Sequence, residues 1–390
     1  MEIRKMKAAE LDQNITLGEF AFQFELSSEQ REDRRKMIKP ENIWVAVENK
    51  EIASKLTIIP SDIYIAGQIM KMGGISGVAT WPEKRRSGLV RELLRSALED
   101  IKERGCDVSL LYPFSFSFYR KFGWELFADA KTWTLSSHQL PEPLPLEKGS
   151  IFRVKQKAGA VLQPIYKKWA VSYTGAVIRD KQWWDYMVLK RKTGEIAVFK
   201  NKQGEDRGYI IYKVKEQKMD VKEFIWLDEE ARTALWSFLA QHDSMITEVE
   251  MKPAVDDPSR FLLPDSRITE KRESYFMARI VNMTSFLEKY PLNLKEGEEL
   301  NLKIEDDFCE WNQGFYSLEN VDGSIHIRFF PGRSEHEGLE LNIQTAAAVF
   351  MGYISARQAW ESGRIKGTKE QADLLNSGVS PMEPFIYDFF

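Results

Sequence analysis

The sequence contains few cysteine and histidine residues, which form the disulfide bonds of small folds and bind metals. Its 390 residues include only two cysteines, Cys106 and Cys309, which lie far apart. The four histidines are scattered, and neither HExxH nor a paired-cysteine spacing occurs. We therefore expect a reducing compartment, no disulfide framework and no metal site.

Long hydrophobic runs and an excess of one charge are also lacking. No stretch of 18 apolar residues is present, and no apolar segment follows residues 1–7, so we expect a soluble, cytoplasmic protein with no membrane partner. The net charge of −4 gives no electrostatic reason to expect a nucleic-acid partner. With 43% hydrophobic and 29% charged residues, the composition is that of a globular protein, and the length favours two or three domains.

The first part of the chain mixes strand and helix patterns. Strands are predicted at residues 43–47, 52–59, 63–70 and 74–80. An amphipathic stripe then predicts a helix from about Ser87 to Gly105. A buried strand at 107–112 and a short helix at 115–122 follow. This order indicates an α/β sandwich of the α+β type rather than a doubly wound sheet.

A proline-rich segment at residues 141–148 predicts a linker. Beyond it, a second α/β pattern covers residues 149–280, and a third covers residues 281–390. The second pattern predicts helices at 160–172, 181–192 and 228–241, and strands at 196–199, 208–214, 222–227 and 247–251. The third predicts strands at 300–304 and 325–329 before a helical tail. We therefore expect a first domain at residues 1–140, followed by the linker and two further domains.

The most informative motif is the turn Arg85-Arg86-Ser87-Gly88, which joins a predicted strand to the amphipathic helix. Backbone N–H groups at a helix start lack intrahelical partners, and the helix dipole is positive there. Two arginines add charge, and Gly88 permits close approach to the backbone, so the turn suits a phosphate or pyrophosphate. The alternative is a solvated turn in which Ser87 caps the helix.

The spacing of Arg85-x-x-Gly88 after a strand resembles the acyl-CoA-binding signature of the GNAT acetyltransferase superfamily. A second GNAT-like element, Phe-Tyr-Arg-Lys-Phe-Gly-Trp at residues 118–124, follows at the appropriate distance. The resemblance implies that the strand at Val78, Ala79 and Thr80 binds the pantetheine arm of acetyl-CoA. It also implies that a pyrophosphate site is formed by the backbone and charges of Arg85, Arg86, Ser87, Gly88 and Leu89. Val90 departs from the signature, which has a small residue there.

Acetyl transfer from a thioester to an amine needs an acid for the departing thiolate. Tyr119 is the best candidate, because its ordinary pKa of about 10 lies slightly above that of a thiol. The alternative is a packed aromatic residue with a structural role. No histidine or carboxylate near the motifs stands out as the base. The chain ends in an apolar segment, however, and burial of Phe390 would carry its α-carboxylate inward, where it could orient or deprotonate an amine. Simple docking of this tail into a domain core is the alternative.

The whole architecture resembles the Eis (enhanced intracellular survival) family. Its features are a GNAT domain, a proline-rich linker, a second GNAT-like domain without the phosphate turn, and a third domain ending in phenylalanine. The resemblance implies a sterol-carrier-like third domain, acetyl-CoA as co-substrate in the first domain only, and a hexamer. It also implies that Tyr119 is the acid, that the Phe390 carboxylate reaches the active site, and that the acceptor is the primary amine of an aminoglycoside, a polyamine-like molecule or lysine. Phe389 departs from some aminoglycoside-modifying members, which have a carboxylate there.

Aromatic residues predict an amine pocket with cation–π character, formed by Phe24, Trp81 and Phe114, although a core position is equally compatible with each. Two non-enzymatic alternatives remain open. One is a carrier of an apolar ligand with a vestigial acyltransferase site, and the other is a scaffold that binds partners through its second domain. The carrier alternative depends on aromatic residues of the third domain, namely Phe308, Trp311, Phe315, Tyr316, Phe329 and Phe330.

Overall fold

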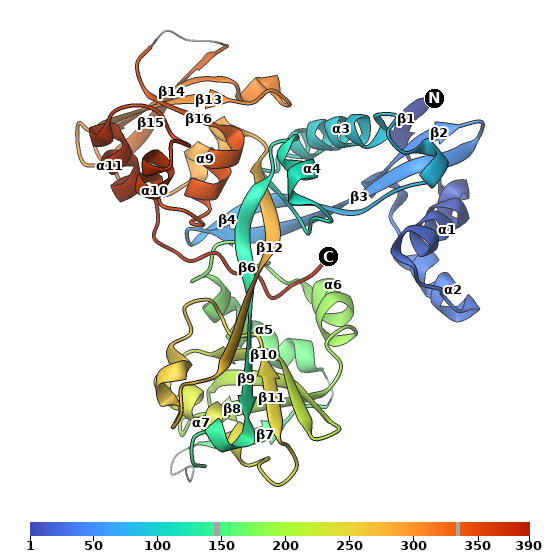
Figure 1. The fold of residues 1–390 in the computed structure, drawn as a ribbon, viewed down its shortest axis with the longest axis vertical. Helices are drawn as coiled ribbons and strands as arrows, with labels where there is room; N and C mark the ends of the chain where they lie inside the picture. The colour runs from blue at the N-terminus through green and yellow to red at the C-terminus, as the bar shows by residue number, and fades with distance from the viewer. Residues whose placement is uncertain (144–148, 156, 333–335) are drawn as a thin grey trace.

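The computed structural model describes residues 1–143, 149–155, 157–332 and 336–390. Residues 144–148 of the predicted linker therefore lie outside the described part of the chain. Figure 1 shows an N-terminal part beside the C-terminal domain, with the second domain below both. Two long strands run from the upper region into the lower one, and the C-terminus lies at the centre (Figure 1).

The N-terminal part is a strongly curved sheet covered on both faces. Its strands lie in the order β1 (Glu2–Lys5), β2 (Ile43–Glu48), β3 (Glu51–Ile65), β4 (Gln68–Thr80) and β5 (Val108–Leu111). The helices are α1 (Leu11–Phe22), α2 (Ser28–Met37), α3 (Leu89–Glu103) and α4 (Phe116–Arg120). Helix α3 buries its predicted apolar stripe on one face of the sheet, including Leu93, Leu94 and Ile101. Helix α1 packs on the opposite face, so the sheet is the middle layer.

One predicted strand is wrong. Residues 63–70 do not form a continuous strand, because β3 ends at Ile65 and β4 begins at Gln68. The chain reverses at Ala66 and Gly67, whose φ angles are 50° and 76°. Positive φ at both central residues is the geometry of a tight hairpin turn, which matches the twist of the flanking strands. The regular alternation of apolar residues on both sides concealed this turn.

The second domain repeats the mixed pattern. Its strands are β7 (Ser150–Arg153), β8 (Glu195–Lys200), β9 (Asp206–Lys215), β10 (Lys218–Trp226) and β11 (Glu248–Met251). Its helices are α5 (Ala158–Ala170), α6 (Lys181–Trp183), the π-helical η5 (Trp184–Leu189) and α7 (Glu229–Ala240).

Two long strands join this domain to the first one. Strand β6 (Glu125–Ser136) pairs with β11, and β12 (Thr269–Ile280) pairs with β5. The two also pair with each other along their length, which gives one 12-stranded sheet. Each of the two domains therefore contributes a strand that pairs with a strand of the other, and the two domains share one continuous sheet.

The third domain has a four-stranded sheet in the order β15-β14-β13-β16. Its strands are β13 (Glu299–Glu305), β14 (Gly314–Val321), β15 (Ser324–Pro331) and β16 (Leu339–Asn342). Its helices are α8 (Met283–Lys289), α9 (Ile343–Phe350), α10 (Ala356–Glu361) and α11 (Lys369–Gly378). Short 3-10 turns lie along the whole chain, at Ala8–Glu10, Pro40–Asn42, Pro82–Lys84, Ser137–Gln139, Pro258–Leu262 and Glu310–Asn312. The whole is a mixed α/β protein, as predicted, and the last residues run back toward the other domains.

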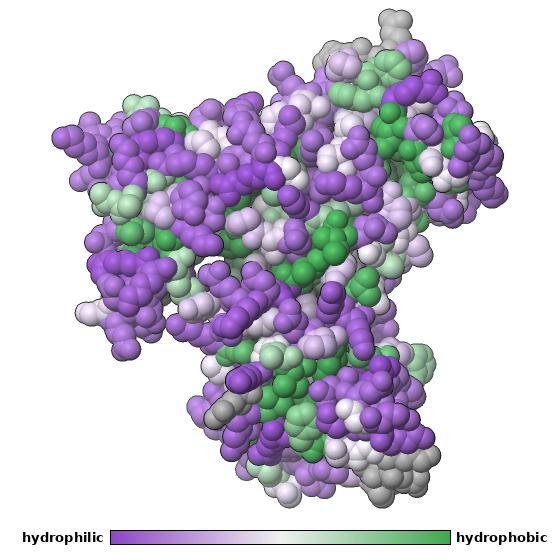
Figure 2. Space-filling view, turned by 180° about the vertical axis from the view of Figure 1, so that it is seen from behind, coloured by the Kyte–Doolittle hydropathy of each residue, from purple (hydrophilic) through white to green (hydrophobic). Residues whose placement is uncertain are grey.

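The surface fits this layered packing. Figure 2 shows a face that is mostly hydrophilic, with hydrophobic side chains gathered in separate groups. In the described ranges, no helix combines the length and apolar character needed to span a bilayer.

Candidate functional site

The site begins where the parallel strands β4 and β5 separate. They pair only at Met72–Val108 and Ile75–Leu111. Just beyond, the β3–β4 register shifts, so that β4 carries an extra residue around Gly77, whose φ is 60°. Such a bulge bends a strand and increases its twist. Beyond Ile75 no described strand pairs with β4 on the β5 side, so the backbone edge from Val78 to Thr80 faces an open space.

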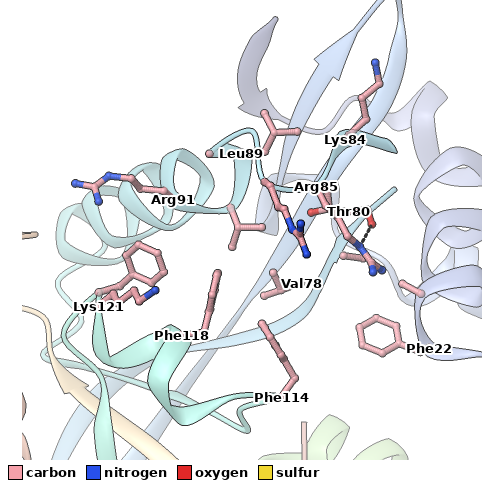
Figure 3. A pocket seen from close by; sticks show the side chains of 16 residues that line it. Phe22, Val78, Thr80, Lys84, Arg85, Leu89, Arg91, Phe114, Phe118 and Lys121 are labelled. Carbon is pink, nitrogen blue, oxygen red and sulfur yellow. Dashed lines mark hydrogen bonds between the residues drawn. The ribbon is translucent and has the colours of Figure 1, made fainter. Parts of the chain in front are cut away.

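That open space is a cavity of about 680 Å³ between β4, the start of α3 and α4. Figure 3 shows Val78, Thr80 and Arg85 on one side of it and Phe114 and Phe118 on another. Its lining comprises Ala21, Phe22, Val78, Ala79, Thr80, Lys84, Arg85, Arg86, Gly88, Leu89, Val90, Arg91, Phe114, Phe118, Lys121 and Phe122. Seven of the eight residues predicted to bind the cofactor are in this set, and the exception is Ser87. The departure at Val90 does not close the cavity, because Val90 forms part of its wall.

The helix start is built for close approach of a ligand. Helix α3 begins at Leu89, and its N-cap is Gly88, with a φ of 84° and no side-chain cap. Ser87 is not the cap, since its hydroxyl donates a hydrogen bond backward to the Lys84 carbonyl oxygen. A Cβ atom at Gly88 would meet nothing within 4 Å, and both Gly88 and Leu89 line the cavity, so the start of α3 is open to a ligand.

Four cations line the cavity without a carboxylate partner anywhere in the described ranges: Arg85, Arg86, Arg91 and Lys121. Arg85 instead donates from Nε to the Thr80 carbonyl oxygen at 3.3 Å, on the free edge of β4. The fifth cation of the lining, Lys84, pairs with Glu48. Arg91 also lies over the Phe308 ring at 5.4 Å. Cations without a carboxylate partner around a helix N-terminus suit a ligand with several negative charges. Sequence reasoning missed Arg91 and Lys121, although Arg91 lies on the first helical turn and Lys121 lies within the second motif.

The second motif is explained by a tight contact at Gly123. Its φ is 90°, and a Cβ there would lie 1.3 Å from the Arg279 guanidinium, so only glycine fits. Arg279 is fully buried, donates to the Phe122 carbonyl oxygen and pairs with Asp306 of the third domain at 2.6 Å. The motif therefore fixes α4 against β12 and the third domain, and this contact holds the wall of the cavity in place.

Tyr119 is separated from the cavity by the rings of Phe114 and Phe118. It is 3% exposed, and its ring contacts those of Phe114 and Phe118, with centroids 5.5 and 5.2 Å away. Both phenylalanines line the cavity, whereas Tyr119 does not. Burial raises the pKa of its hydroxyl well above the usual value of 10, so the side chain stays protonated at neutral pH.

The predicted amine-pocket residues fall in two places. Phe114 lines the cavity and is 72% exposed. Trp81 lies outside the lining, and its ring packs against that of Phe20 with the centroids 4.8 Å apart and the planes tilted by 42°. It donates its indole N–H to the Ile52 carbonyl oxygen. Phe24 is also outside the lining and 40% exposed. Phe22, which sequence reasoning did not single out, lines the cavity instead.

Phe390 ends the chain beside the point where β4 and β5 separate. A Cβ at Gly74 would touch the Phe390 ring, whereas one at neighbouring Gly73 would touch Ile101 of α3. The tail therefore lies on the face of β4 opposite α3. The ring of Phe389 contacts that of Tyr112, directly after β5, at 5.1 Å. Phe390 thus lies on β4 and Phe389 lies beside the end of β5, on the face of β4 opposite α3. In the described ranges, no group of three or more histidine, cysteine or acidic side chains is placed to hold a metal ion.

Comparisons with known proteins identify three segments. Residues 2–127 and 175–280 each match a family described as an acetyltransferase (GNAT) domain, and residues 283–387 match a sterol carrier protein domain. The N-acetyltransferase Eis of Mycobacterium tuberculosis is 26% identical over 325 residues, which cover 78% of this chain and 76% of that protein. An uncharacterized N-acetyltransferase of Streptomyces griseus is 22% identical over 87% of this chain and 86% of its own.

Solved structures show the same arrangement over the whole chain. A protein of Enterococcus faecalis V583 described as a probable N-acyltransferase is 27% identical and covers 100% of this chain and 99% of its own, with a TM-score of 0.90. Eis1 of Mycobacterium abscessus is 18% identical and covers 100% of both chains, with a TM-score of 0.83, which extends the likeness in fold.

Proposed function

As a member of the Eis-like N-acetyltransferases of the GNAT superfamily, this chain is an acetyltransferase, and we propose that it acetylates a primary amine with acetyl-CoA bound in the cavity between β4 and α3. The observation that carries this proposal is the combination of a free β4 edge with unpaired cations at an open helix N-terminus. The pyrophosphate would lie against the N–H groups beginning at Leu89. Backbone groups of Val78 to Thr80 would pair with the pantetheine amides.

The proposed reaction is a direct transfer. The neutral amine attacks the thioester carbonyl carbon, the C–S bond breaks, and the leaving thiolate takes a proton from the Tyr119 hydroxyl. The raised pKa of Tyr119 keeps the phenol protonated until the thiolate leaves, but it also makes the phenol a weaker acid than a thiol, whose ordinary pKa is near 8.5. Transfer of the proton is therefore coupled to cleavage of the C–S bond, when negative charge develops on the sulfur. For this step the hydroxyl must reach the thioester past Phe114 and Phe118, and Phe114 is exposed enough to move.

The amine loses a proton during the attack, and we assign its acceptance to the Phe390 carboxylate, directly or through water. Its support is the position of the tail across β4 and β5 at their separation. The same carboxylate would anchor an ammonium group before reaction. As acceptors we propose an aminoglycoside, a polyamine-like molecule or lysine, with the exposed ring of Phe114 available for a cation–π contact.

The test is to follow free thiol released from acetyl-CoA over a panel of aminoglycosides, polyamines and lysine peptides. Turnover with at least one amine is expected, and failure to bind acetyl-CoA would refute the proposal. A chain extended beyond Phe390 should bind acetyl-CoA normally but lose turnover. Persistent turnover in the extended chain would remove the carboxylate from the mechanism. The hexamer and the cytoplasmic location stay predictions, to be checked by light scattering and by fractionation.

Four of the six aromatic residues that supported the carrier alternative have packing or hydrogen-bonding partners. Phe308 packs on Phe122 of the first domain at 5.0 Å, and Trp311 donates its indole N–H to the Val281 carbonyl oxygen. Tyr316 and Phe329 stack on each other at 4.5 Å. These aromatic side chains are therefore accounted for by packing within and between domains.

A further inference from the structure

The second domain has an opening between β10 and β11, named here the second cleft, of the same design as the opening between β4 and β5. Strand β10 pairs in parallel with β11 only over Lys218–Val221. Its register with β9 then shifts between Val221 and Glu223, so that β10 bulges just where it leaves β11, as β4 does where it leaves β5. Helix α7 follows β10 as α3 follows β4. In both halves, the longer strand therefore has no partner among the described strands on that edge beyond the bulge.

The chain's own C-terminal segment occupies this second edge. The Tyr387 hydroxyl donates to the Phe224 carbonyl oxygen at 3.2 Å and accepts from the Phe224 N–H at 3.4 Å. One side chain thus satisfies both backbone groups of a residue on the free part of β10. Tyr387 is buried, and its ring also packs against that of Trp169 at 5.3 Å.

The C-terminal segment also supplies a carboxylate that balances the positive charge of the second cleft. Arg179 and Glu223 are fully buried and pair at 2.6 Å, and Lys192 also pairs with Glu223. Without the tail this group would hold the buried Arg179 and the partly buried Lys192 against one carboxylate. Asp388, 1% exposed, supplies the second carboxylate and pairs with Arg179 at 3.1 Å. It also accepts from the indole N–H of Trp183 at 2.9 Å. An unbalanced buried charge is costly, so the site is built for an anionic side chain.

We infer that the cleft of the second domain is a binding site for residues 384–390 of the same chain, with Tyr387 and Asp388 as the recognised groups. Occupation by the tail leaves no room for a second acyl-CoA on β10. Docking also sets the position of Phe390, which follows two residues later and lies on β4. The catalytic consequence of that placement rests on the proposed function, whereas the docking itself does not. Tyr387 and Asp388 are accordingly positioning residues.

The test uses the full chain and measures hydrogen–deuterium exchange of the peptide spanning residues 384–390. Asp388→Asn removes the balancing charge at unchanged size, and Tyr387→Phe removes only the hydroxyl that bonds to Phe224. The matched control is Asp185→Asn, which breaks an exposed pair with Lys181 in the same domain. We expect exchange in the tail to become at least about tenfold faster in Asp388→Asn, to rise less in Tyr387→Phe, and to stay unchanged in the control.

Tail exchange as slow as in the original chain, in both Tyr387→Phe and Asp388→Asn, would overturn the docking site even if the variants were less active. If docking positions Phe390, Asp388→Asn should lower kcat at least about tenfold and leave the acetyl-CoA KM unchanged, because the cofactor cavity lies elsewhere. A tail loosened without any loss of kcat would support the docking site and remove the catalytic role of Phe390. Acetyltransferase activity absent from the original chain would sink only the proposed function, because exchange needs no turnover.

Discussion

Replacement of Gly88 by alanine tests whether the start of α3 holds the pyrophosphate. Gly88 has a φ of 84° and lines the cavity, and a Cβ there would meet no protein atom within 4 Å. The chain offers a matched control in Gly105, which follows the other end of α3 with a φ of 72° and equally open space. Alanine at either position carries the same left-handed strain, but only the Gly88 methyl group would stand in front of the ligand.

The expected magnitudes separate strain from ligand contact. A left-handed alanine costs about 1 kcal/mol of folding free energy, so both variants should lose similar stability. At Gly88 the methyl group would also displace a phosphate oxygen from the backbone N–H groups. Loss of one charge-assisted hydrogen bond costs roughly 1.5–3 kcal/mol, which is about a 10- to 100-fold rise in the Kd for acetyl-CoA.

Isothermal titration of acetyl-CoA into both variants, with chemical denaturation alongside, gives the comparison. Gly88→Ala should bind about 10- to 100-fold more weakly than Gly105→Ala at matched stability. Equal acetyl-CoA affinity in the two variants would refute the assignment of the α3 start as the pyrophosphate site. Weakened binding in both would indicate a general distortion of α3 instead.

Three further predictions concern single side chains. Tyr119→Phe should lower kcat by about 100-fold in the thiol-release assay with little change in the acetyl-CoA KM, since only the proton donor is lost; unchanged kcat would exclude it as the acid. Lys121→Gln should raise the acetyl-CoA Kd about three- to tenfold in titrations at low salt and less at high salt, because a partly exposed charge is screened; an effect independent of salt would argue against a Coulombic role. Burial lowers the pKa of Lys55 to about 7, so the folded chain binds fewer protons than the unfolded chain between about pH 7 and 10 and the free energy of unfolding rises with pH there. Lys55→Met should remove that rise and stabilise the chain at pH 6 by up to about 5 kcal/mol in denaturant titrations, and an unchanged pH slope would contradict this.

Much of the fold could be predicted from local sequence patterns. The apolar stripe predicted α3 almost to its ends, and the turn before it was placed at a helix start because Arg85 to Gly88 separate a strand pattern from that stripe. Seven of the predicted cofactor residues line one cavity because they lie on two consecutive elements. Helix α2 gave no comparable signal, since none of its residues is buried and its polar sequence lacks a stripe.

Features formed by distant residues could not be predicted. The exchange of β6 and β12 between the two halves depends on pairing across more than a hundred residues, and no local pattern specifies it. The buried group that joins Arg179 to Asp388 spans 209 residues of sequence. The apolar tail showed that burial was needed, but its location is set by charges and backbone groups of the second domain. The same applies to Phe114 and Trp81, whose different surroundings arise from tertiary packing.

The most direct test of the account is the stoichiometry of acetyl-CoA binding to the full chain, measured by isothermal titration and followed by thiol release with an active amine. We expect one acetyl-CoA per chain, with binding weakened by Gly88→Ala and kcat lowered about 100-fold by loss of the Tyr119 hydroxyl. Two acetyl-CoA molecules per chain would contradict occupation of the second cleft by the tail. Absence of binding would contradict the central claim that the cavity between β4 and α3 is an acyl-CoA site.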